Sequence, residues 1–141
     1  MQAKMFGAFI ALLGFLLAIT PIYIFPTCSE MITTVSGSTL PMKCFWSGRA
    51  ELGIGSLIFA GGILTIFFSS LQAKLAISLM LFMSSLLALA VPAFLIGGCQ
   101  IEMMACQLTT FPAVYVLSGI ISLSCLVNAA YLYHKTKLEN Y

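Results

Sequence analysis

The residues of this chain best suited to chemistry are four cysteines placed just outside its apolar segments. They are Cys28, Cys44, Cys99 and Cys106. A Pro-x6-Cys element followed by a Met-x-Cys element occurs once in each half of the chain, starting at Pro21 and at Pro92. Such a doubled set of sulfur atoms suits structural disulfides, thiol–disulfide exchange or a soft-metal site.

Structural disulfides are the first interpretation of the cysteines. Four cysteines admit three connectivities. Pairing within each loop, Cys28 with Cys44 and Cys99 with Cys106, respects the repeat, whereas pairing between the loops joins the two halves. Each bridge would stabilise the fold by about 2–4 kcal/mol.

Thiol–disulfide exchange with a membrane quinone is a second interpretation. Four-pass membrane oxidoreductases that form disulfides have a similar plan, with a cysteine pair in each of two outer loops and an arginine after the first pair. Here Arg49 follows Cys44 by five residues. The chain lacks the C-x-x-C spacing that most readily activates a thiol.

Copper binding is a third interpretation, because thiolate and thioether ligands favour Cu(I). The candidate ligands are Met42, Cys44, Met104 and Cys106. The single histidine, His134, is expected on the other side of the membrane. No set of residues for another catalytic class assembles, so no catalytic residue and no resident cofactor are expected, with quinone and copper as the alternatives.

The composition predicts an integral membrane protein. Hydrophobic residues make up 61% of the 141 residues and charged residues 7%, against about 25% charged in soluble domains. Four stretches approach the roughly 20 residues needed to cross a bilayer, at about 5–25, 51–69, 75–96 and 112–133. The sequence predicts one all-α domain over 1–141, a four-helix transmembrane bundle. The doubled motif has two interpretations, a pair of helix–loop–helix repeats and a chance likeness of the two halves.

The basic residues predict the orientation, since the side richer in Lys and Arg is normally cytoplasmic. Lys4, Lys74, Lys135 and Lys137 lie on one side of the predicted spans. Both termini are therefore expected in the cytoplasm, and the loops 26–50 and 97–111 outside a bacterial cytoplasmic membrane. A net charge of +2 gives no patch for nucleic acid.

Other residues suggest contacts with helices or lipid. Gly48, Gly55 and Gly62 recur every seven residues, a spacing that suits close helix packing within the bundle or against a partner helix. Trp46 is expected at the membrane interface, and Arg49 near lipid phosphates or a quinone headgroup. Glu51 is expected at the membrane surface, where the start of a helix favours a negative charge.

One segment carries a family resemblance. The run Met42–Gly55 (MKCFWSGRAELGIG), the later Met-x-Cys loop and Asn128 resemble an uncharacterised bacterial domain-of-unknown-function family of small four-pass membrane proteins. Relatives often carry histidine where this chain has Phe45, which weakens a metal site by analogy. Members resemble accessory proteins encoded beside ABC transporters with large extracytoplasmic domains.

The resemblance therefore implies a non-enzymatic accessory subunit that meets a transporter permease within the bilayer. Transport by the chain alone is not expected, because the sequence places no charged residue in the middle of a predicted span. The alternatives remain a quinone-linked oxidoreductase and an outer-face Cu(I) binder.

Overall fold

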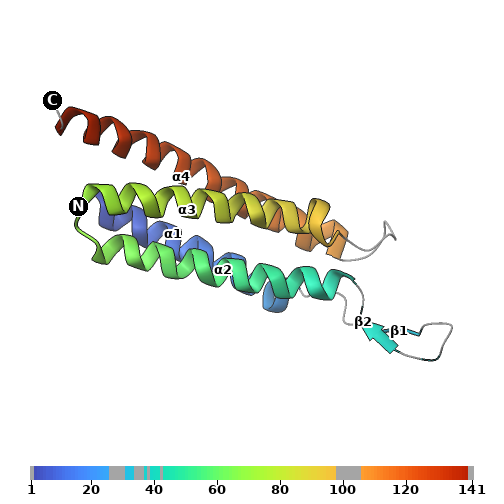
Figure 1. The fold of residues 1–141 in the computed structure, drawn as a ribbon. Helices are drawn as coiled ribbons and strands as arrows, with labels where there is room; N and C mark the ends of the chain where they lie inside the picture. Colours follow the sequence, from blue (N-terminus) through green and yellow to red (C-terminus); the bar gives the residue numbers. More distant parts are fainter. Residues whose placement is uncertain are drawn as a thin grey trace.

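The computed structural model describes residues 2–25, 31–33, 37, 39–41, 43–97 and 106–139. Its main elements are four helices, α1 (Gln2–Ile19), α2 (Lys43–Phe67), α3 (Leu71–Ala90) and α4 (Phe111–Glu139), packed as a bundle (Figure 1). Each helix, with its adjoining turn, is long and apolar enough to cross a membrane. The predicted all-α fold and multi-pass membrane protein are confirmed.

A short β-hairpin lies beyond one end of the bundle. Its strands, β1 (Met31–Thr33) and β2 (Thr39–Pro41), pair antiparallel with Ile32 opposite Leu40. Figure 1 places the hairpin at the end opposite both chain termini. We call these two ends of the molecule the hairpin end and the terminal end.

The observed start of α2 differs most from the sequence prediction. The helix begins at Lys43, two turns before the predicted position 51. The sequence prediction puts Arg49 just before the helix and Glu51 at its first position, but a helix continues past its apolar segment wherever packing supports it. Glu51 therefore lies inside the helix, and its predicted place at an exposed helix start is wrong.

A proline turn ends each of the odd-numbered helices. The π-helical turn η1 (Thr20–Ile24) follows α1, and η2 (Val91–Leu95) follows α3, each with proline as its second residue. Proline removes an N–H donor and clashes with the carbonyl four residues earlier, and the wider π turn accommodates it. The closing bonds also correspond: the Phe25 N–H donates to the Thr20 carbonyl at 2.8 Å, and Ile96 N–H to Val91 at 3.0 Å.

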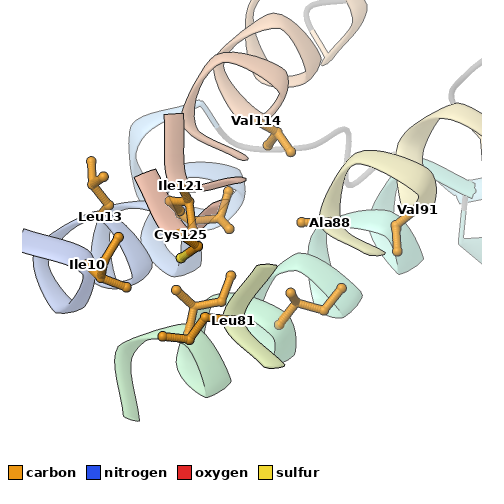
Figure 2. Close-up of a cluster of buried hydrophobic side chains, with 11 residues drawn as sticks. Ile10, Leu13, Leu81, Ala88, Val91, Val114, Ile121 and Cys125 are labelled. Carbon is orange, nitrogen blue, oxygen red and sulfur yellow. The ribbon is translucent and has the colours of Figure 1, made fainter. Parts of the chain in front are cut away.

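Each position of η1 corresponds to the position of η2 that lies 71 residues later, and proline is the second residue of both. This correspondence supports the interpretation of the chain as two helix–loop–helix units. The first unit comprises α1, η1 and α2, and the second comprises α3, η2 and α4, preceded by a further π turn, η3 (Cys106–Thr110). Helices within each unit contact each other more extensively than helices of different units. One buried cluster nevertheless joins all four helices, including the free thiol Cys125 (Figure 2).

Glycines allow α1 and α2 to approach closely. A Cβ atom on Gly55 would lie 2.5 Å from the Ala18 nitrogen, and one on Gly62 would lie 2.5 Å from the Ala11 nitrogen. Since both neighbours are backbone atoms of α1, these positions admit only glycine. Gly55 and Gly62 therefore face α1. For these two glycines, close packing within the bundle is confirmed, and the alternative of contact with a partner helix is wrong.

Asn128 supplies a polar contact within the second unit. Its Nδ2 donates a hydrogen bond of 2.8 Å to the Ser78 hydroxyl of α3, which is fully buried. A polar side chain among transmembrane helices needs such a partner. Asn128 thus joins α4 to α3.

Candidate functional site

Of the four predicted disulfide or redox cysteines, Cys44 is the best described. It lies in the first turn of α2, is fully buried and is disulfide-bonded. Cys28, Cys99, Met42 and Met104 lie outside the described residues, and of Cys106 only the backbone, at the start of η3, is described. A disulfide sulfur does not offer the thiolate that Cu(I) binds, so the state of Cys44 argues against copper at this residue.

The metal interpretation gains no further support from the rest of the described chain. Residues 2–25, 43–97 and 106–139 bring together no group of three or more His, Cys, Asp or Glu side chains that fits a metal ion. The copper and quinone alternatives stay predictions.

The other predicted contact residues lie on both the exposed and the buried faces of α2. Trp46 is 57% exposed and meets the Phe45 ring edge-on, with centroids 5.9 Å apart. The exposed Arg49 guanidinium lies 5.2 Å from the centre of the same Phe45 ring, within cation–π distance. Gly48, by contrast, is buried.

The residue that sequence reasoning missed is Glu51. Its side chain is 2% exposed, and neither carboxylate oxygen has a hydrogen-bond partner in the described part of the chain. A buried, uncompensated carboxylate costs several kcal/mol. Ionisable residues inside membrane spans generally mark functional sites, so Glu51 is the centre of the candidate site.

Glu51 borders a small cavity between the two proline turns. The cavity measures about 10 Å³, roughly the space of one water molecule. It is lined by Pro21, Ser47, Gly48, Glu51, Pro92, Thr110, Phe111 and Val114. The paired prolines of the sequence repeat therefore meet at the same carboxylate.

Two hydroxyl groups beside this cavity link the units to each other. Ser47 in the first unit donates to the Gly97 carbonyl just after η2, at 3.0 Å. Thr110, just before α4, donates to the Phe25 carbonyl just after η1, at 2.9 Å. Each unit thus satisfies a carbonyl at the end of the other unit's proline turn.

A sequence signal for the burial of Glu51 exists. Gly48, Gly55 and Gly62 repeat every seven residues, and so do Glu51, Ile58 and Thr65, three residues further on. All six are buried. Positions three and four apart alternate along one helix face, so the glycine repeat places Glu51 on the packed face of α2.

We expect the two hydroxyl bonds to stabilise the junction of the units. Ser47→Ala and Thr110→Val should each lower the free energy of unfolding by about 1–3 kcal/mol, because each leaves a partly buried carbonyl without its donor. Denaturant titration in detergent micelles measures this. Ser56→Ala is the matched control, since that exposed hydroxyl bonds only to Gly53 of its own helix. An equal cost for Ser56→Ala would contradict the role of the junction.

Comparison with known proteins assigns a family. The family model described as Domain of unknown function (DUF4418) matches residues 10–132. The chain belongs to this family. The match runs from the first helix to near the end of α4, so the DUF4418 region contains both proline turns, Cys44 and Glu51. No curated protein and no solved structure matches the chain significantly.

Proposed function

We propose that this DUF4418 protein is a non-enzymatic accessory subunit of a bacterial membrane transport complex. Its hairpin end would face outward from the cytoplasmic membrane, braced by disulfides, and its helices would meet a transporter permease, of the ABC class, in the bilayer. The observation that carries the proposal is the exposed face of α2 near the start of that helix, at the hairpin end.

That face combines an aromatic and cationic cluster with an open helix surface. Near the start of α2, Phe45 contacts both Trp46 and Arg49. Four residues after Arg49 comes Gly53, and a Cβ there would meet nothing within 4 Å. Trp and Arg are enriched among residues that dominate protein interfaces, and small residues let transmembrane helices approach. This face, rather than Gly55 and Gly62, is the proposed partner surface.

The disulfide supports a rigid attachment for that surface. Cys44 adjoins Phe45, so its bridge would hold the cluster in place beside the projecting hairpin (Figure 1). Within the proposal, its partner is Cys28, which would close the loop that carries the hairpin. A preorganised surface binds more tightly because less conformational freedom is lost on binding.

The test is co-purification from native membranes in mild detergent. Wild type should retain a permease, and both Trp46→Ala and Gly53→Leu should lose it, the second because leucine would fill the approach of the partner helix. Gly119→Leu on α4, also at an open position, is the matched control and should retain the partner. Wild type that purifies without any membrane partner, or retention by all three variants, would contradict the proposal.

A further inference from the structure

We propose that Glu51 binds a single proton inside the bundle, and that this proton stabilises the junction of the two helical units. The site is the cavity between the proline turns together with the unpartnered Glu51 carboxyl that borders it. The proposal concerns the chain itself and does not depend on a partner subunit.

The surroundings of Glu51 offer few hydrogen-bond donors. Pro21 and Pro92 have no N–H group. The hydroxyl hydrogens of Ser47 and Thr110 point to the carbonyls of Gly97 and Phe25, so these hydroxyls present lone pairs to other neighbours. An ionised carboxylate only accepts hydrogen bonds. It therefore finds no complement among these side chains.

One proton removes this mismatch. A protonated carboxyl is neutral and has one O–H donor, which suits a hydroxyl oxygen or a single bridging water in a cavity of about 10 Å³. The cavity is too small to admit a lysine or arginine side chain from a partner, so the proton is the ligand that fits.

No other described ionisable group around the site compensates the charge of Glu51 in place of the proton. On α2, Lys43 and Arg49 are exposed and make no ion pair with Glu51, and Cys44 is disulfide-bonded. Tyr23 of η1 is 80% exposed. On α4, Tyr115 is 37% exposed and donates no hydrogen bond to Glu51. The described side chains of η2 and η3 include no ionisable group.

The proton has a measurable effect on stability. Glutamate in the unfolded chain loses its proton near pH 4.3, whereas the folded chain retains it. Above that pH the folded state holds one more proton than the unfolded state, so stability falls as pH rises. The unfolding constant should rise up to about tenfold per pH unit until the folded state also releases the proton.

The first experiment compares wild type with Glu51→Gln over pH in detergent micelles. The amide is a neutral near-isostere of the protonated acid, so the variant should fold and should lose the one-proton pH dependence. Equal pH dependence in both proteins would overturn the proposal. A shift of stability between sodium and choline buffers at constant ionic strength, present in wild type and absent in Glu51→Gln, would also overturn it, because a metal cation would then occupy the site.

A second measurement uses wild type alone, and so does not require the variant to fold. The infrared spectrum separates the C=O stretching band of a protonated carboxyl group from the bands of an ionised carboxylate, and it needs no reagent to enter the closed cavity. In ester-free detergent at neutral pH, the folded protein should show one protonated carboxyl group, and that band should disappear when the chain unfolds. A folded protein without the band at neutral pH would overturn the proposal.

Discussion

Leucine in place of Gly55 is expected to separate α1 from α2 and to cause a large loss of stability. The added Cβ would lie 2.5 Å and 2.7 Å from the nitrogen and Cα of Ala18. The backbone of α1 cannot move aside as a flexible side chain can. The free energy of unfolding should therefore fall by at least about 3 kcal/mol, the upper end of the usual range for an overpacked core. Unfolding by SDS titration in mixed micelles measures this loss.

The matched control lies two residues away on the same helix. Gly53→Leu adds the same side chain at a position where nothing lies within 4 Å of the new Cβ. It should leave the unfolding transition of the isolated chain nearly unchanged, although it should disturb partner binding. Equal destabilisation by the two leucines would mean that helix propensity, and not the α1–α2 contact, sets the cost.

Loss of the Cys44 disulfide should have the second large effect. Cys44→Ser is expected to lower the free energy of unfolding by about 2–5 kcal/mol, the usual range for a native bridge. With reductant added to both proteins, the unfolding temperature of wild type should fall to that of the variant, and the decrease should be larger for wild type because only wild type loses the bridge at Cys44. Peptide mapping of the thiol released in Cys44→Ser also identifies the partner cysteine.

Cys125→Ala is the control for this comparison. Cys125 is a free, fully buried thiol, so its replacement should lower stability by the loss of packing yet leave the response to reductant intact. A wild-type protein whose unfolding temperature ignores reductant would contradict a stabilising role for the bridge at Cys44.

The sequence predicted the bundle because its signal is strong and local. Four apolar segments of spanning length were enough to predict four helices, whereas the proline-based motif that occurs twice left two units and a chance likeness both open. The packing role of Asn128 was also predictable, since an amide in an apolar span requires a partner, which is Ser78.

The candidate site was harder to predict because it depends on contacts between distant segments. Charge alone placed Glu51 at the membrane surface, and no local pattern shows that two proline turns 71 residues apart enclose it. The role of Gly55 and Gly62 stayed open between bundle packing and partner contact for a related reason: a glycine repeat indicates close approach but not which helix approaches. Gly55 and Gly53 lie two residues apart, but Gly55 is on the side of α2 that α1 covers and Gly53 is on an open side.

The short connection between the units has a mechanical consequence. Phe68–Ser70 ties α2 to α3 at the terminal end, whereas Glu51 lies sixteen residues before the end of α2 at Phe67, roughly 24 Å away at 1.5 Å per residue. With the connection as a hinge, this helix segment is a lever arm. A rotation between the units of about 5° would part the walls around Glu51 by roughly 2 Å over that length, enough to let water in while the core near the hinge barely moves.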